Sequence, residues 1–365
     1  MKATTLKIGV LILTFLVILA TLASTGEAAM YAVTFGDRTV EGVVVGRVGG
    51  NTHLLGRDGR LWTIPDSEVT KSKKTADRFR PYSVSQIRAQ LLRELGQGYE
   101  VSGTAHYLVA HPAGQRDRWA QRFEQLYGTF VNYFTVRGFE LTEPPFPLIG
   151  IVCRNHDDFV KYAKANGGLV GKGVMGYYSS TSNRILVFDV GKSGGQGRWE
   201  LNDSVVLHEA THQVSFNTGI CNRLSPPPLW VAEGLAMLFE APGVFDSTKY
   251  PTRTDRINRT RFDDYRQIIA VPSNEKLAEK LPRTLVVSDA LFKASPSVAY
   301  AESWAMTFYL IETRPRLYAS YLRLISSQPA FHKVSPSVRE INFTNIFGDN
   351  WPMFVSHFER FMSEL

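Results

Sequence analysis

The chain has 365 residues, of which 44% are hydrophobic and 21% charged, and its formal net charge at pH 7 is +7. This composition leaves ample apolar material for a core and excludes a wholly disordered, collagen-like or coiled-coil chain. Two cysteines are too few for a disulfide-stapled miniprotein, and the dispersed, mildly basic charge does not indicate nucleic acid as a partner.

The N-terminal segment is typical of a secretory leader. Lys2 and Lys7 precede an apolar run from Ile8 to Ala23, and small residues follow it. This pattern predicts a signal peptide over residues 1–28, and export to the periplasm, the cell envelope or the medium. The alternative is an uncleaved anchor, because the run approaches the ~18 residues that a membrane span needs. The membrane is an expected partner only in that case.

Export would place the two cysteines in an oxidising compartment. Cys153 and Cys221 could then form a disulfide, or they could be two separate buried thiols. The sequence leaves both alternatives open.

Residues 30–70 contain short alternating segments separated by Gly36-Asp37, Gly49-Gly50 and Asp58-Gly59. Asp-Gly and Gly-Gly pairs favour hairpin turns, so we expect a small all-β barrel here. It resembles the Src-homology-type barrels often appended to exported enzymes, which implies a docking role, with a cell-envelope polymer as a candidate partner. The basic, polar segment 71–81 ends at a proline and is predicted to be a linker.

The remainder, residues 82–365, is predicted to be α+β, with a sheet subdomain over 82–198 and a helical subdomain over 199–365. The expected elements are helices at 83–96, 115–137 and 157–165, strands at 100–110, 147–153 and 184–190, a flexible loop at 191–197, and mainly helices from 201 onward. The strand at 184–190 is our candidate for the edge of a substrate cleft, where an extended peptide could pair.

The chemistry of the chain is concentrated at His208-Glu-Ala-Thr-His212. Residues i and i+4 of a helix share one face, so both histidines can direct a nitrogen at one metal ion. Glu209 lies beside them and can reach a water bound to that ion. Asn202, Asp203 and Ser204 offer a start for this helix.

A catalytic zinc site usually has three protein ligands and one open position. Glu233 is the candidate third ligand, because a lone carboxylate in the otherwise apolar helix from Leu229 to Phe239 needs a partner. Glu240 is the lesser candidate, since it falls at the helix end, where solvent can satisfy it. Gly234 would let this helix approach a neighbouring helix closely.

His208-Glu-Ala-Thr-His212 followed by Trp230-Val-Ala-Glu233-Gly-Leu-Ala resembles the gluzincin pattern of zinc metallopeptidases. The closest resemblance is to an uncharacterised, peptidase-MA-like family of exported bacterial proteins, over roughly residues 95–320, including Asn217-Thr-Gly. It implies one Zn²⁺ per chain bound by His208, His212 and Glu233, with Glu209 as general base. It also implies a gluzincin-like catalytic domain with the cleft between its sheet and helical subdomains.

Two further expectations follow from this resemblance. Tyr300 matches the place of a tyrosine that hydrogen-bonds the oxyanion in gluzincins. The segment Gly173-Val-Met-Gly-Tyr-Tyr178 lacks the glutamate with which related aminopeptidases hold a free amine, so an endopeptidase is the expectation.

The leading hypothesis is therefore an exported zinc metallopeptidase acting on a peptide or protein substrate. One alternative is a cell-envelope binding protein with a structural or vestigial zinc site. The other is a zinc hydrolase of a non-peptide amide, because the activation of water is shared.

Overall fold

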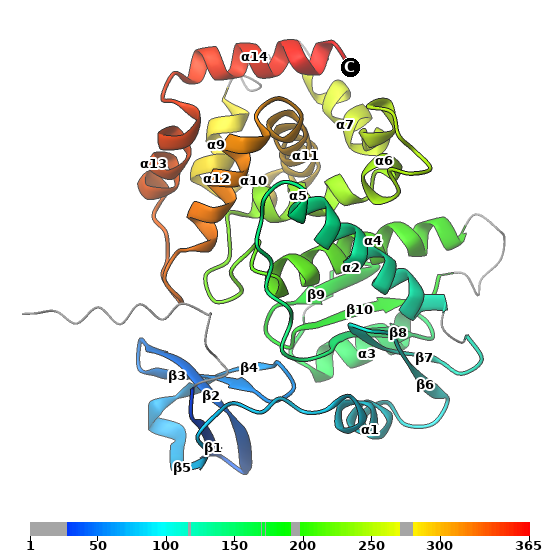
Figure 1. Cartoon of the computed structure of the whole chain (residues 1–365), viewed down its shortest axis with the longest axis vertical. Coiled ribbons are helices and arrows are strands. Elements are labelled where there is room, and N and C mark those ends of the chain that lie inside the picture. The colour runs from blue at the N-terminus through cyan, green and yellow to red at the C-terminus, as the bar shows by residue number, and fades with distance from the viewer. Residues whose placement is uncertain (1–27, 116–117, 169, 172, 191–197, 271–279) are drawn as a thin grey trace, which may run out of the picture.

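The computed structural model describes residues 28–115, 118–168, 170–171, 173–190, 198–270 and 280–365 (Figure 1). The predicted leader, apart from Ala28, lies outside these residues. The predicted loop at 191–197 also lies outside them. The strands are β1 (Met30–Phe35), β2 (Arg38–Val48), β3 (Asn51–Gly56), β4 (Leu61–Pro65), β5 (Val69–Ala76), β6 (Tyr99–Gly103), β7 (Tyr107–Pro112), β8 (Leu148–Cys153), β9 (Gly176–Ser179) and β10 (Arg184–Phe188).

The helices of the N-terminal and central parts are α1 (Val84–Leu95), α2 (Arg118–Thr135), α3 (His156–Ala165), α4 (Arg198–Asn217), α5 (Leu229–Phe239), α6 (Pro242–Phe245) and α7 (Arg259–Ile269). Those of the C-terminal part are α9 (Leu281–Val287), α10 (Leu291–Ala294), α11 (Pro296–Thr313), α12 (Pro315–Ser326), α13 (Pro336–Phe347) and α14 (Trp351–Ser363). Short 3₁₀ turns lie at η2 (Asp66–Glu68) and η4 (Thr254–Arg256). The protein is α+β, as predicted.

The first sheet is antiparallel, with the strand order β4-β3-β2-β1-β5. Its ladder is open in the described residues, because β4 and β5 form its two edges, so the structure shows an open sheet where a barrel was predicted. The predicted linker is wrong for residues 71–76, which belong to β5 and pair with β1. The side chains of β5 are nearly all exposed, and an edge strand rich in lysine resembles a solvated connector in sequence.

The second sheet is mixed, with the order β6-β7-β8-β10-β9. Strands β7, β8 and β10 are parallel, whereas β6 and β9 are antiparallel edge strands. The segment predicted as one strand at 100–110 is thus the hairpin β6–β7. The cleft edge predicted at 184–190 is also wrong: β10 lies between β8 and β9, and the edge is β9. An apolar run buried on both faces is typical of an interior parallel strand.

Helices cover both faces of the second sheet (Figure 1). Alternate strand residues point to opposite faces. Val109, Leu148 and Ile185 pack against α2 and α4, whereas Leu108, Ile149 and Leu186 pack against α1 and α3. The aromatic stripe predicted for 115–137 forms the buried face of α2, so it belongs to the core.

The C-terminal helices pack above this layer and share its larger core. Gly234 in α5 lies against α11, since a Cβ built on it would be 2.0 Å from Thr307 Oγ1 and 2.6 Å from the Ser303 carbonyl oxygen. The close approach predicted for Gly234 is confirmed. Cys153 and Cys221 are buried free thiols in different core clusters, which is the second of the two alternatives. Within the described residues, no helix is both long and apolar enough to cross a membrane.

Candidate metal centre

Helix α4 carries the two histidines and Glu209. It begins at Arg198, before the predicted start at Asn202. The Asn202 side chain instead accepts a hydrogen bond from the Val190 amide at 3.1 Å and donates to Asp189 Oδ1 at 3.0 Å. The residue that could have capped the helix therefore ties α4 to the segment after β10.

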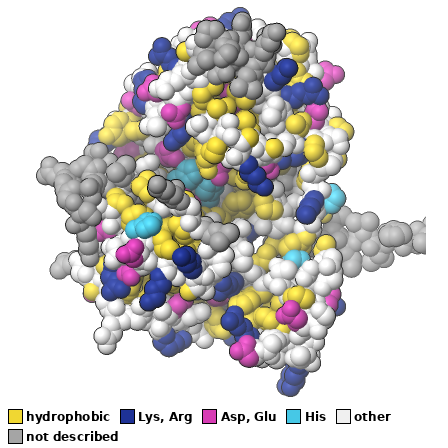
Figure 2. All heavy atoms as spheres, turned by 180° about the vertical axis from the view of Figure 1, so that it is seen from behind, with side chains coloured by type: hydrophobic (Ala, Val, Ile, Leu, Met, Phe, Trp, Pro, Cys, Tyr) yellow, Lys and Arg dark blue, Asp and Glu magenta, His cyan; other side chains and the backbone are white. Residues whose placement is uncertain are grey.

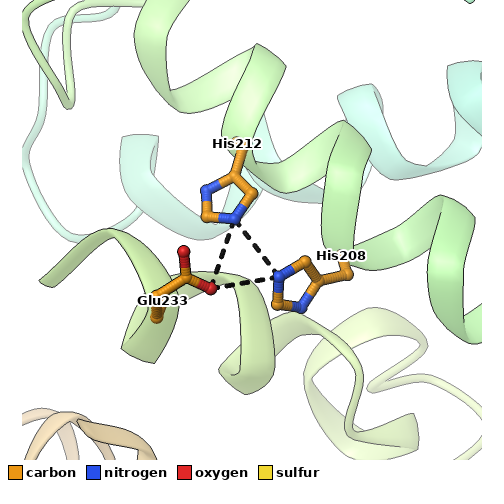
Figure 3. A group of neighbouring side chains, drawn as sticks. All are labelled: His208, His212 and Glu233. Atoms are coloured by element: carbon orange, nitrogen blue, oxygen red, sulfur yellow. Dashed lines mark hydrogen bonds and ion pairs between the residues drawn. The ribbon is translucent and has the colours of Figure 1, made fainter. Parts of the chain in front are cut away.

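Three side chains from α4 and α5 converge on one point (Figure 3). His208 Nε2 lies 3.2 Å from His212 Nε2 and 3.2 Å from Glu233 Oε2, and His212 Nε2 lies 3.5 Å from the same oxygen. Ligand atoms of a tetrahedral zinc ion, with bonds of about 2.0–2.1 Å, are about 3.3–3.4 Å apart. The spacing of the three atoms thus fits one face of such a tetrahedron, and the group could hold a metal ion.

The bonding of these atoms also fits a cation. Glu233 Oε2 is buried and makes no hydrogen bond in the described structure. Burial disfavours a charged His208, but Glu233 and Glu240 outweigh it and raise its pKa well above the usual value. Burial opposes ionisation of Glu233 as well, yet His212 and His208 hold its pKa far below the usual value. The carboxylates and imidazoles therefore favour a positive charge at the point where they converge. A divalent cation would supply this charge.

Glu240 contacts His208, although its place at the helix end suggested that solvent would satisfy it. Its Oε1 lies 2.7 Å from His208 Nδ1, and its Oε2 accepts a hydrogen bond from Asn258 Nδ2 at 2.8 Å. A carboxylate on the far nitrogen of a ligating histidine fixes the orientation and tautomer of the ring. The sequence indicated Glu240 only as the lesser candidate ligand, and its contact with His208 was not predicted. One signal existed: Glu240 follows Glu233 by seven residues, two helical turns, and so lies on the same face of the helix.

Asn258 connects this carboxylate to α7. Its Nδ2 also donates to the Met237 carbonyl at 3.0 Å, and its Oδ1 caps α7 by accepting from the Arg261 amide at 3.3 Å. Asn258 is 6% exposed. The end of α5 and the start of α7 are thus joined behind His208.

Glu209 lies next to the ligands and is held by the sheet. Its Oε2 accepts a hydrogen bond from the Tyr178 amide of β9 at 2.7 Å. Burial raises the pKa of Glu209, with Glu233 adding to the rise while His208 and His212 oppose it. A carboxylate with a raised pKa is a stronger base. The sequence predicted Glu209 beside the ligands, but not the strand that orients it.

Tyr300 lies in the first turns of α11, packed edge-on against Phe292. Burial raises its pKa to about 12, and the nearby Glu233 and Glu209 contribute to that rise. The hydroxyl therefore stays protonated at neutral pH and lies within electrostatic range of both carboxylates. No direct hydrogen bond joins it to the three ligands in the described structure.

One face of the molecule has a depression that contains histidine side chains (Figure 2). Figure 2 shows histidine side chains deep in a depression that is bordered largely by hydrophobic side chains. The three ligand side chains keep 12–19% of their surface exposed, so the centre is open to water at one side.

Residues 202–332 match a protein family described as a protein of unknown function (DUF1570). The matched segment contains the three converging ligands, Glu209, Glu240 and Tyr300, and leaves out the first sheet. No curated protein matches the chain. The part of the chain that carries the candidate metal site is therefore similar to a family of unknown function.

Proposed function

We propose that this protein is an exported zinc-dependent metallopeptidase of gluzincin type, in which Glu209 acts as the general base. The resemblance of its two sequence motifs to gluzincins and the leader-like N-terminus support this proposal. The ligand set of two imidazoles and one carboxylate is typical of catalytic rather than structural zinc sites.

One observation carries the proposal. Glu209 is beside the three converging ligand atoms, yet its carboxylate is turned to the edge strand and held there by the Tyr178 amide at 2.7 Å. A structural zinc site needs no such group, whereas hydrolysis needs a base that is close to the ion without being its ligand.

Each residue then has a defined task. A bound zinc ion would polarise the scissile carbonyl and make water more acidic. Glu209 would take a proton from the attacking water and later give it to the leaving amine. Tyr300, which stays protonated, would donate a hydrogen bond to the oxygen that becomes negatively charged. Glu240 would keep His208 in the tautomer that leaves Nε2 free for the metal.

The substrate would lie along β9, the edge strand next to Glu209. Amide groups of successive strand residues point to opposite sides. Because the Tyr178 amide points to Glu209, Gly176, two residues earlier, also directs its backbone groups away from β10. An extended peptide could pair with them. The missing amine-binding glutamate in segment 173–178 favours internal cleavage of blocked peptides.

The test compares Glu209→Gln with Glu233→Gln in zinc content and in hydrolysis of a broad library of N-blocked peptides. Glu209→Gln should keep one zinc per chain and lose about 10²–10⁴-fold in rate. Glu233→Gln should lower zinc affinity, because a neutral amide is a poorer ligand than a carboxylate.

Full hydrolysis by zinc-loaded Glu209→Gln would refute the base assignment. A wild-type protein that holds zinc but cleaves no peptide would favour a binding protein, unless it hydrolyses simple acyl amides, which would favour the non-peptide hydrolase.

A further inference from the structure

The first sheet contacts the metal-binding part of the molecule at the turn that ends β9. This turn, residues 180–183, joins β9 to β10. Arg223, which follows α4, donates from Nε to the Ser180 carbonyl at 2.7 Å and from Nη2 to the Gly59 carbonyl of the first sheet. The Leu61 amide at the start of β4 donates to the Thr181 carbonyl at 2.7 Å. Two hydrogen-bonded links therefore reach this one turn.

The other side of the turn is bound to the metal-carrying helix. Asn183 has a left-handed backbone, with φ 58°, and is 3% exposed. Its side-chain amide pairs reciprocally with that of Asn217 at the end of α4, at 2.9 and 2.8 Å. It also accepts the Tyr178 hydroxyl at 2.8 Å, and Gln213 of α4 donates to its carbonyl at 2.8 Å.

These contacts fix a short strand. β9 has four residues, and among the described residues it pairs with β10 along one side only. Strands of this length at a sheet edge have little stability of their own. Tyr178, whose amide holds Glu209, is the third residue of this strand and lies two positions before Ser180 of the turn. The position of Glu209 thus depends on how firmly the turn is anchored.

We propose that the first sheet is a structural part of the active site: through Arg223 and Leu61 it anchors the β9–β10 turn, and so positions the strand that orients Glu209. Arg223 is then a positioning residue. This inference rests on the proposed function for its effect on catalysis, but its structural part can be tested without any activity.

A second contact between the same two parts of the molecule provides a matched control. Phe331, in the loop between α12 and α13, stacks on His53 of β3 with ring centroids 3.8 Å apart. This contact joins the first sheet to the helical part and does not touch the turn. Phe331→Leu should loosen the docking of the sheet while leaving the anchor in place.

The experiment measures hydrogen exchange of the backbone amides of residues 176–183 in full-length, zinc-supplemented protein. Arg223→Met should speed exchange there at least tenfold, whereas wild type and Phe331→Leu should be alike. Arg223→Lys replaces the guanidinium group by one ammonium group, which can reach only one of the two carbonyls. Its exchange rate should lie between those of wild type and Arg223→Met. It replaces the methionine variant if that one fails to fold.

Hydrolysis by the same proteins completes the test. In the part of the chain that the structure describes, the hydrogen bonds of Arg223 go to Ser180 and Gly59 and none goes to the metal ligands. Arg223→Met should therefore lower kcat about tenfold, with zinc content unchanged and KM changed less than twofold. Wild-type exchange rates in both Arg223 variants would overturn the anchor. Faster exchange with unchanged kcat would overturn its catalytic role. An inactive wild type would overturn the proposed function and leave the exchange result to decide the anchor.

Discussion

Replacing Gly234 by alanine tests whether the contact between α5 and α11 determines the positions of the side chains in the candidate metal centre. Helix propensity alone predicts a gain of about 1 kcal/mol, because alanine is the better helix former. The structure predicts the opposite sign. The new Cβ would lie 2.6 Å from the Ser303 carbonyl oxygen, a backbone atom that cannot rotate away, and 2.0 Å from Thr307 Oγ1.

The size of the effect follows from these distances. Ordinary contacts are about 3.5 Å, so α5 has to move away from α11 by roughly 1 Å. Overpacking of this kind costs about 1–3 kcal/mol, which exceeds the gain in propensity. Glu233 is the neighbouring residue, so the same movement would change the 3.2 and 3.5 Å separations from the histidines and weaken metal binding.

Denaturant unfolding and a zinc titration measure both effects. Gly128→Ala is the matched control, since Gly128 lies in α2 and a Cβ there would meet nothing within 4 Å. It should stabilise the protein by up to about 1 kcal/mol. Adding Thr307→Ala to Gly234→Ala should restore part of the loss, because it removes the nearer of the two clashing atoms. A Gly234→Ala protein as stable as the control, with normal zinc affinity, would refute the reasoning.

Three other substitutions have defined outcomes. Glu240→Ala should weaken zinc binding about 10–100-fold in a competition titration, because it removes the carboxylate that orients His208. Tyr300→Phe should lower kcat about 10²–10³-fold with zinc content unchanged, as expected for the loss of one oxyanion donor. Burial raises the pKa of Glu302 from about 4.5, its value in the unfolded chain, to about 8. The free energy of unfolding should therefore fall as the pH rises from 4.5 towards 8. Glu302→Gln should remove that slope and be about 3 kcal/mol more stable than wild type near pH 7 in urea unfolding.

The three side chains of the candidate metal centre could be predicted because their placement depends on local rules. His208 and His212 are one turn apart on a helix, and this spacing brings their nitrogens together whatever the rest of the fold does. Glu233 was predictable for a different reason, since a buried carboxylate requires a partner. The structure places these three side chains as predicted.

The residues that orient the site could not be found in this way. The spacing of Glu240 from Glu233 places both on one face of the helix, but only the packing of α5 against α4 shows that Glu240 faces His208 instead of water. Tyr178 contributes a backbone amide, which has no side-chain signature at all. The error over the cleft edge has the same origin, because the order of strands in a sheet is set by contacts distant in sequence.

The prediction of a separate barrel and linker at residues 30–81 also affects the functional interpretation. As an appended barrel joined by a flexible linker, it would be a separate binding module, and substitutions in it would leave the metal centre unchanged. In the structure the supposed linker supplies β5, and the turn before β4 reaches Ser180 and Thr181 through Arg223 and Leu61. The DUF1570 match covers residues 202–332 and so leaves out both sheets, including β9, whose Tyr178 amide holds Glu209. If the proposed function holds, the functional unit is therefore larger than the matched region: a fragment beginning at α4 would contain the three candidate ligands but would lack β9 and the turn that the first sheet contacts.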